Sequence, residues 1–269
     1  MKRIYLEITN SCNLNCSFCS YKKGNNFLTI EEIDNYTTQI KEFTDYIYLH
    51  ILGEPLLHPQ IEKILDILDA KDINLQLVTN GTLLSKHKNI LNHKCIRKLS
   101  ISIHSINNLD IDDNYFETIN ELIENNNDKT IELRFYNRQQ LSDKLNSYLS
   151  TLKNRYSFLD TKRDNSYRLK EHVYIYFQDF FKWPEIDDDV VSTTGTCHGG
   201  IDMIGINSKS DVTICCLDPK AYNKLGNLKE KSLKEILQSD LYDQFVTNFK
   251  NHRIDSELCK RCTYRLRFK

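Results

Sequence analysis

The sequence predicts an α/β protein, in which a partial (β/α)6 barrel over residues 1–186 is followed by a small C-terminal domain over residues 187–269. Strand-like segments alternate with helical ones up to about Gln178, which is the rhythm of βα units around a parallel sheet. Within these strands apolar and polar residues also alternate, so one face can pack against helices while the other stays polar. The acidic run at 187–189 reads as a solvated linker and sets the boundary.

Six segments have the strand pattern, and together they predict a polar interior. They are Arg3–Ile8, Tyr46–Ile51, Asn74–Thr79, Lys98–His104, Thr130–Tyr136 and His172–Phe177. A closed, packed barrel would fill its interior with branched apolar side chains. The polar faces therefore predict a partly closed barrel whose interior is a reaction chamber. A half-exposed antiparallel sheet is the alternative, and the helical segments between the strands argue against it.

Three helix starts can be placed from local patterns. Thr29 with Glu32 forms a capping box, as does Ser232 with Glu235. Another helix is expected to begin at Pro59, because apolar residues follow it at helical spacing. The helix at Ser232 is expected to pack the C-terminal domain against the barrel.

Charge is balanced, with 36 Lys and Arg against 37 Asp and Glu and a net charge of -1. This balance offers no basic patch for nucleic acid or for a membrane surface. The first residues alternate around Glu7 and do not form the apolar core of a signal peptide. No later segment approaches the roughly 20 apolar residues of a membrane helix. We therefore expect a cytoplasmic protein that binds neither nucleic acid nor membrane.

The chain has nine cysteines, and an odd number without an export signal favours metal ligation over disulfides. Three of them, Cys12, Cys16 and Cys19, lie in CNLNCSFC just after the first predicted strand, at the end where barrels place their sites. Cubane iron-sulfur clusters are normally held by four cysteines, so three leave one iron open to bind a small molecule. Zinc with a fourth, distant ligand is the alternative.

This loop resembles the CxxxCxxC loop of the radical S-adenosylmethionine (SAM) superfamily, which follows the first strand of a partial barrel. The resemblance implies a SAM-binding [4Fe-4S] cluster and a 5′-deoxyadenosyl radical that abstracts hydrogen from a substrate. It also implies that Phe18, which precedes the third cysteine, lies beside the adenine of SAM.

The segment Gly53-Glu54-Pro55 resembles the family's GGEP motif, although Leu52 replaces the first glycine. By resemblance, the backbone near Gly53 contacts the methionyl amine of SAM and Glu54 helps to orient that backbone. The alternative is a plain strand-to-helix turn with Pro59 at the helix start.

Polar residues at the ends of later strands complete the resemblance. Asn80, in Thr-Asn-Gly at the end of the third strand, suits a turn close to a ligand. The family's fourth and fifth strands supply a polar and a basic residue near the ribose or carboxylate of SAM, and Ser102 and Arg134 match these positions. Arg134 in an ion pair with Glu132 or Glu7 is an equal alternative.

The remaining cysteines gather near the C-terminus, at Cys197, at Cys215 and Cys216, and in a CxxC at Cys259 and Cys262. Four of these five can form a complete thiolate set, which leaves no open iron and suits a structural or electron-transferring cluster. A four-cysteine zinc site is the alternative.

This region resembles the Twitch domain, a shortened relative of the SPASM domain that follows radical SAM barrels. The likeness rests on DVTICCLD, KLGNLKEKSLKEIL and the final CKRC. It implies one auxiliary [4Fe-4S] cluster held by Cys197, Cys215, Cys259 and Cys262. Cys216 and Cys95 are then interpreted as buried small hydrophobes.

The layout of the whole chain resembles that of 2-deoxy-scyllo-inosamine dehydrogenases, which oxidise a carbinol of an aminocyclitol. The resemblance implies an oxidoreductase that dehydrogenates a small polar or sugar-like substrate and takes electrons from a donor such as flavodoxin or ferredoxin. Maturation of a ribosomally made peptide is the runner-up, although no leader-binding domain is evident. A non-catalytic zinc-binding interaction module is the alternative from another class.

Overall fold

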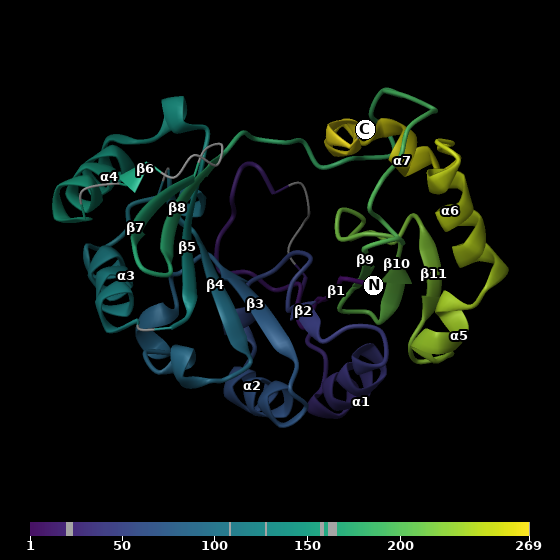
Figure 1. The fold of residues 1–269 in the computed structure, drawn as a ribbon, viewed down its shortest axis with the longest axis horizontal. Coiled ribbons are helices and arrows are strands. Elements are labelled where there is room, and N and C mark those ends of the chain that lie inside the picture. The colour runs from purple at the N-terminus through teal and green to yellow at the C-terminus, as the bar shows by residue number, and fades with distance from the viewer. Residues whose placement is uncertain (20–23, 108, 127, 157–158, 161–165, 269) are drawn as a thin grey trace. The chain divides into compact units, whose positions relative to one another are not determined.

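The structure is a computed structural model that describes residues 1–19, 24–107, 109–126, 128–156, 159–160 and 166–268. By compactness the chain divides into two units. The first unit combines residues 1–73 with 181–269, and the second is Asn74–Phe180. The predicted division at residue 186 stays a prediction. Each unit is described in turn, and Figure 1 labels their elements.

The sheet of the first unit joins the N-terminal strands to strands from the end of the chain (Figure 1). Its order is β11 (Lys224–Asn227), β10 (Asp211–Thr213), β9 (Met203–Ile206), β1 (Arg3–Leu6) and β2 (Tyr46–Tyr48). β1 runs parallel to both of its neighbours, whereas β10 is antiparallel to both of its own. Pairing of β9 with β1 therefore makes the C-terminal strands an extension of the N-terminal sheet.

Helices α1 (Ile30–Lys41) and α2 (Ile61–Ala70) lie side by side in this unit (Figure 1). The predicted capping box of α1 is confirmed, because Thr29 and Glu32 exchange side-chain and backbone hydrogen bonds. The predicted start of α2 at Pro59 is wrong. The amide of Gln60 donates to Nδ1 of His58 at 3.2 Å, and the backbone of Gln60 is not helical, so the helix begins only at Ile61.

Three short helices follow the C-terminal strands: α5 (Leu233–Leu237), α6 (Asp240–Lys250) and α7 (Glu257–Arg261). The capping box of Ser232 with Glu235 is confirmed. The amide of Leu233 donates to Oε1 of Gln39 at 2.7 Å, which holds α5 against α1 as expected.

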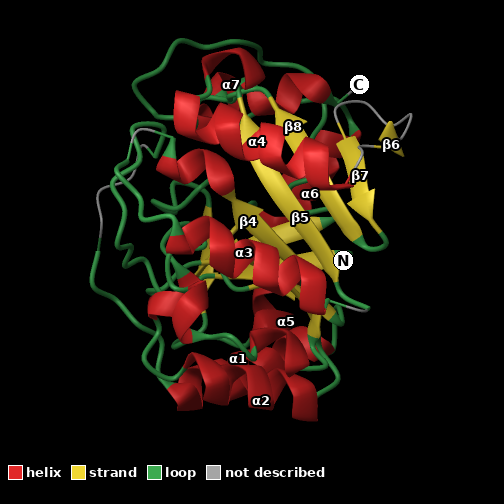
Figure 2. Cartoon of the chain, turned by 90° about the vertical axis from the view of Figure 1, so that its left-hand side faces the viewer, coloured by secondary structure: helices red, strands yellow, loops and turns green. Residues whose placement is uncertain are grey.

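The second unit has its own run of strands with helices over one face (Figure 2). The strand order is β3 (Asn74–Thr79), β4 (Ile96–Ser102), β5 (Thr130–Tyr136), β8 (Val173–Gln178), β7 (Ser166–Lys170) and β6 (Leu159–Asp160). The first four are parallel and the last two antiparallel. α3 (Asn114–Asn125) and α4 (Asp143–Tyr156) cover the face on which Ile131, Leu133 and Phe135 are fully buried. Partly exposed side chains alternate with these three, as the sequence predicts.

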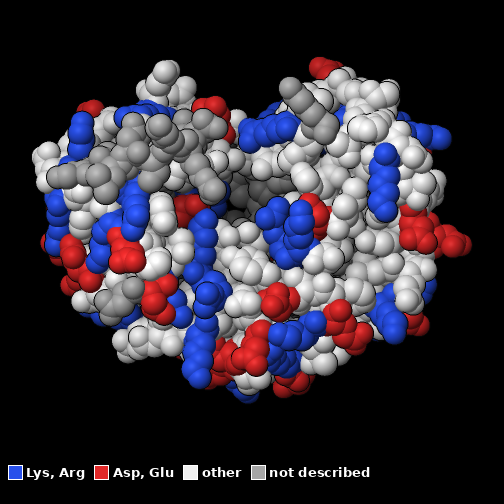
Figure 3. All heavy atoms as spheres, viewed as in Figure 1, with Lys and Arg blue, Asp and Glu red and all other residues white. Residues whose placement is uncertain are grey.

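Single 3-10 turns connect many of these elements. They are Pro55–Leu57, Leu84–Lys86, Ile90–Asn92, Ile103–Ile106, Arg138–Gln140 and Tyr264–Arg267. On the face drawn in Figure 3, basic and acidic side chains are interspersed. Within the described ranges, no helix is both long and apolar enough to cross a membrane.

The acidic run at 187–189 is largely solvated, as the sequence predicts, since Asp187 and Asp189 are exposed, and Asp188 also makes local bonds. The carboxylate of Asp188 pairs with Nζ of Lys182 and accepts the amide of Glu185 at 3.1 Å. These bonds fold the segment back on itself. Lys182 and Glu185 lie only a few residues before Asp188, so its carboxylate can bond to both of them without a distant partner.

Candidate cofactor sites

The three N-terminal cysteines lie in the loop that follows β1. Cys12 and Cys16 are half-buried and Cys19 is exposed. The amide of Leu14 donates to Sγ of Cys12 at 3.4 Å, and the amide of Cys19 donates to the carbonyl of Cys16 at 3.0 Å. Phe18, half-buried, is part of the same loop. The loop thus directs the backbone amide of Leu14 at one sulfur, a contact that stabilises thiolate ligands.

Glu7 fixes the place where this loop leaves the sheet. Its carboxylate is buried and accepts the amides of Leu52 and Ser208, each at 2.9 Å. Burial raises the pKa of Glu7, while the two amide bonds oppose that rise. One side chain therefore ties the end of β1 to the segments that follow β2 and β9.

The predicted GGEP-like segment packs against the cysteine loop. Gly53 has φ 75°, and a Cβ there would collide with the carbonyl oxygen of Thr9, so only glycine fits. The amide of Glu54 donates to the carbonyl of Ser11 at 2.8 Å. The buried Glu54 carboxylate accepts the amide of Leu56 at 3.1 Å and caps a 3-10 turn. Glu54 thus orders the backbone of this turn, and its role toward SAM stays a prediction.

Asn80 orders the loop after β3 in the second unit. Its side-chain oxygen accepts the amide of Thr82 at 2.9 Å, and its carbonyl accepts the hydroxyl of Tyr115 at 3.0 Å. Gly81 follows with φ 83°, and a Cβ there would lie 2.9 Å from the side chain of Ile101. This tight turn brings backbone to the carboxyl end of β3, where parallel sheets bind ligands.

Ser102 and Arg134 occupy the same register position on β4 and β5. Nη2 of Arg134 donates to the hydroxyl of Tyr136, and the guanidinium lies 5.5 Å from that ring's centre. The alternative of a structural ion pair is not what the structure shows. Glu132 pairs with Lys98 at 2.6 Å, and Glu7 accepts backbone amides.

His104 belongs to the wall beside Arg134. Its ring stacks on Tyr136 with centroids 3.7 Å apart, and Nδ1 lies 3.1 Å from the carbonyl of Arg134. Burial, with the Arg134 charge as a second cause, lowers the pKa of His104 to about 3. The imidazole is therefore neutral at ordinary pH.

Phe18, Gly53 and Glu54 therefore belong to the first unit, with the N-terminal cysteines. Asn80, Ser102 and Arg134 belong to the second. Ser102 and Arg134 share a register position, and Gly53 and Glu54 contact residues 9–11 of the cysteine loop.

The four C-terminal cysteines named as ligands belong to the first unit, and their thiols lie close enough to interact electrostatically. Cys215 interacts in this way with Cys259, with Cys197 and with its neighbour Cys216. It also joins Cys259 to Cys197 and to Cys262, and Cys197 to Cys262. They come from the segment before β9, the turn after β10, and the end of α7.

Burial, reinforced by neighbouring thiols, raises the pKa of Cys215, and it raises that of Cys259 to about 12. A positive iron-sulfur core would reverse this penalty by binding thiolates. Among the described residues, no three Cys, His, Asp or Glu side chains are arranged to hold a single metal ion. A cubane bonds each sulfur to a different iron and so needs a wider cage than zinc, which takes its sulfurs at about 2.3 Å. By its chemistry, a set of four thiols matches the usual ligands of a cubane cluster.

Three residues that the sequence did not single out support this cage. Gly199 donates its amide to Sγ of Cys197 at 3.4 Å, and a Cβ there would lie 3.2 Å from Cβ of Cys215. Nδ2 of Asn223 donates to Sγ of Cys259 at 3.7 Å. Nε of Arg265 donates to the carbonyl of Cys259 at 2.7 Å. Gly199 could have been found from its place beside Cys197, but Asn223 and Arg265 carry no local signal.

The two cysteines interpreted as buried hydrophobes differ. Cys95 is 4% exposed, as predicted. Cys216 is only half-buried, and its thiol is hydrogen-bonded to the hydroxyl of Tyr5 and lies 4.0 Å from Sδ of Met203. The prediction was therefore wrong in part, because neighbouring side chains leave the backbone in different directions and Cys216 meets a polar partner.

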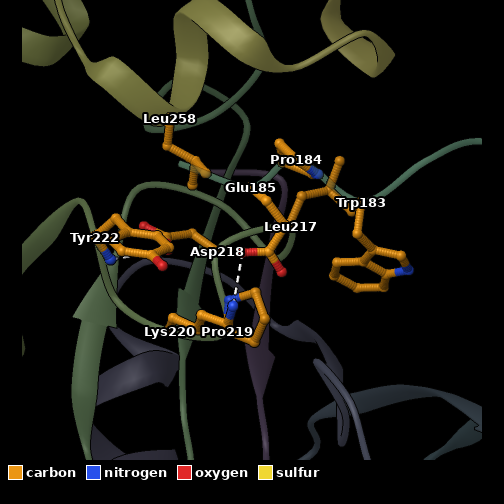
Figure 4. Close-up of a pocket in the computed structure, with 9 residues that line it drawn as sticks. All are labelled: Trp183, Pro184, Glu185, Leu217, Asp218, Pro219, Lys220, Tyr222 and Leu258. Atoms are coloured by element: carbon orange, nitrogen blue, oxygen red, sulfur yellow. Dashed lines mark hydrogen bonds and ion pairs between the residues drawn. The ribbon is translucent and has the colours of Figure 1, made fainter. Parts of the chain in front are cut away.

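A small depression is lined by residues that neighbour the C-terminal cysteines in the chain, among them Leu217 and Leu258 (Figure 4). Its empty space, open solvent included, is about 190 Å³. Its lining residues are Trp183, Pro184, Glu185, Leu217, Asp218, Pro219, Lys220, Tyr222 and Leu258. Nζ of Lys220 pairs with Glu185 at 2.6 Å. Ligand pockets usually start near 300 Å³, so this depression is too small for SAM or a substrate.

Comparison with known families identifies the two cysteine-bearing regions. Residues 6–133 match the radical SAM superfamily, and residues 197–263 match SPASM, an iron-sulfur cluster-binding domain. The chain therefore contains a radical SAM domain and a SPASM domain. The first implies SAM and a [4Fe-4S] cluster, and the second implies auxiliary iron-sulfur binding.

Solved structures share the fold over most of the chain. BtrN in complex with AdoMet and 2-DOIA is 17% identical, with a TM-score of 0.59, over 98% of this chain and 93% of that one. Streptococcus suis SuiB bound to its precursor peptide SuiA is 16% identical, with a TM-score of 0.55, over 90% of this chain and 65% of that one. These likenesses confirm the predicted α/β class of fold, and the radical SAM assignment comes from the family match.

Curated relatives match over shorter stretches. GTP 3′,8-cyclase of Aquifex aeolicus (strain VF5) is 29% identical over 118 residues, which are 40% of this chain and 36% of the relative. A tungsten-containing aldehyde ferredoxin oxidoreductase cofactor-modifying protein of Pyrococcus furiosus is 34% identical over 94 residues, 32% of this chain and 25% of the relative. The chain thus spans about a third or less of these relatives.

Proposed function

We propose that this protein is a radical SAM oxidoreductase that dehydrogenates a carbinol of a small, polar, sugar-like substrate. The observation that carries the proposal is the group of C-terminal thiols in the first unit (the thiol cage), in which Cys197, Cys215 and Cys259 interact with one another and Cys262 interacts with Cys197 and Cys259. A complete thiolate set leaves no iron open to substrate and suits electron transfer. The fold likeness to BtrN, whose structure holds AdoMet and 2-DOIA, supports the substrate class.

In this proposal the loop after β1 holds the catalytic cluster through Cys12, Cys16 and Cys19. When bound, this cluster and SAM would supply a 5′-deoxyadenosyl radical that takes the carbinol hydrogen atom; the auxiliary cluster would accept the electron left on the substrate, and the hydroxyl proton would leave to solvent. Gly53 and the Glu54-capped turn present backbone groups to the methionyl amine, and Phe18 lies beside the adenine.

In the second unit, Ser102 and Arg134 share one register position and bind the ribose and carboxylate of SAM. The fixed fork of Arg134 suits a carboxylate, and its hydrogen bond to Tyr136 holds that fork in place. Asn80 keeps the loop after β3 in shape. A donor such as flavodoxin or ferredoxin reduces the catalytic cluster.

Anaerobic reconstitution with iron and sulfide tests the two clusters. We expect about eight irons in the native chain and about four in a Cys12→Ala, Cys16→Ala, Cys19→Ala variant, with SAM cleavage in the native chain alone. Cys215→Ser should reduce the iron to about four, whereas Cys216→Ser, its matched control, should retain about eight. Zinc in place of iron, with no SAM cleavage, would instead support a zinc-binding interaction module.

Isotope transfer tests the reaction. With an aminocyclitol deuterated at its carbinol carbon, we expect deuterium in 5′-deoxyadenosine and one ketone formed per SAM consumed. Several solved neighbours bind peptides, among them SuiB and anSMEcpe. Deuterium transfer from a peptide, and from none of the carbinols, would overturn the proposed substrate class in favour of peptide maturation.

A further inference from the structure

Arg265 is a buried cation in the auxiliary domain. It is 2% exposed, although it lies close to the C-terminal end of the chain. Its guanidinium donates to three backbone carbonyls: Nε to Cys259 at 2.7 Å, Nη1 to Thr194 at 2.9 Å, and Nη2 to Ser192 at 2.5 Å. These bonds satisfy its donors and fix its position, but carbonyls do not neutralise its charge.

Among the described residues, no carboxylate lies within ion-pair distance of Arg265. Other arginines nearby do have such a partner, since Arg261 pairs with Glu257 at 2.6 Å and Arg253 with Asp255 at 2.7 Å. A buried, unneutralised charge costs several kcal/mol unless a counter-charge accompanies it. Arg265 is therefore a buried positive charge that an anion bound nearby would stabilise.

The thiol cage lies where that anion would be. The Arg265 charge interacts with Cys197 and Cys262, where it opposes the rise in pKa that burial causes. Its Nε contacts the backbone of a third cysteine, Cys259. Asp218 also interacts with Cys259, but it is negative when ionised and would not serve as counter-charge.

We propose that Arg265 is the counter-charge of the auxiliary cluster and raises its reduction potential, so that the cluster accepts the substrate's electron. This inference rests on the proposed function. Four thiolates give a cubane a net negative charge, and reduction adds one more. A fixed cation nearby stabilises the reduced form more than the oxidised form, which shifts the midpoint potential upward. The N–H···S bonds of Gly199 and Asn223 act in the same direction.

The test is a potentiometric titration followed by electron paramagnetic resonance. It uses the full-length chain with Cys12, Cys16 and Cys19 changed to Ala, so that the auxiliary cluster alone gives a signal. Arg265→Gln removes the charge, and Arg265→Lys keeps the charge but cannot reach all three carbonyls. Arg261→Gln is the matched control, because that arginine is already paired with Glu257.

We expect Arg265→Gln to shift the midpoint potential downward, and Arg265→Lys and Arg261→Gln to leave it near that of the parent. A fully loaded Arg265→Gln with an unchanged potential would overturn the proposal. If Arg265→Gln fails to load iron, the result for Arg265→Lys decides between a charge role and a structural role for Arg265. A loaded lysine variant with the parent potential supports the charge role, whereas loss of the cluster in both variants shows a purely structural clamp. A parent chain without iron at this site would refute the proposed function itself.

Discussion

Burial sets the protonation state of single residues in this protein, and His104 is the clearest case. Its ring is stacked on Tyr136, and its Nδ1 lies within hydrogen-bond distance of the carbonyl of Arg134. Burial and the Arg134 charge lower the pKa of His104 to about 3. A neutral imidazole in a packed wall indicates a positioning role beside Arg134.

Stability should depend on pH through His104. Its folded pKa lies below the unfolded value of about 6.5, so between the two the unfolded chain binds a proton that the folded chain lacks. The stability that the neutral His104 contributes is complete above pH 6.5, and it is lost as the pH falls toward 3. Urea unfolding of the metal-free chain should be measured at pH 7.5 and at pH 5.5. The free energy of unfolding should fall between these pH values by about 1 kcal/mol more in the native sequence than in the His104→Gln variant. Equal losses in both proteins would show that His104 titrates normally. His58, whose pKa burial also lowers, contributes equally to both.

Among the elements, the helices with capping boxes are those whose starts the sequence predicts correctly. A capping box is decided within four residues, as in Thr29 with Glu32 before α1. The start of α2 depends on a hydrogen bond between His58 and Gln60, which cannot be predicted from a capping pattern in the sequence. Glu32 also pairs with Lys229 at 2.8 Å, which links α1 to the segment before α5.

The cap of α1 should outweigh its ion pair. Thr29→Ala removes the side-chain acceptor for the amide of Glu32 and should lower the free energy of unfolding by about 1 kcal/mol. Lys229→Gln removes an exposed ion pair and should cost well under about 1 kcal/mol. Urea titrations of both variants measure the difference. A larger loss in the lysine variant would mean that contact with the C-terminal segment, and not the cap, stabilises α1.

At the scale of the whole molecule, the auxiliary cluster joins segments that are far apart in the chain. Its proposed ligands lie at residues 197, 215, 259 and 262, and Arg265 ties the segment at 192–194 to the end of α7. Metal binding to such a set is coupled to folding, because the unfolded chain has no preformed site. Iron and the local fold should therefore be gained and lost together.

Removal of iron by a chelator should increase amide hydrogen exchange in α7 and in residues 192–200, while α3 in the second unit keeps its protection. Mass spectrometry of peptic fragments measures both regions. The same chelation in a Cys259→Ser variant is the control, because that variant should already exchange fast at α7 before treatment. Unchanged exchange at α7 after iron loss from the native chain would contradict this coupling.

The sequence by itself determined what depends on local pattern and on residue chemistry. Alternating strands predicted the α/β class, and two capping boxes placed helix starts. Cysteine spacing with the GGEP-like segment predicted a radical SAM domain, and the later cysteines predicted the auxiliary one, both of which family comparison confirms. These features are readable because each is specified by side chains within a few residues of one another.

Only the tertiary structure decided which distant residues meet. It paired β9 with β1, gave Arg134 the hydroxyl of Tyr136 in place of a carboxylate, and placed Cys216 against Tyr5. It also buried Arg265 beside the thiol cage without a carboxylate partner among the described residues. No local pattern announces such contacts, because they depend on side chains from segments that approach one another only when the whole core has packed.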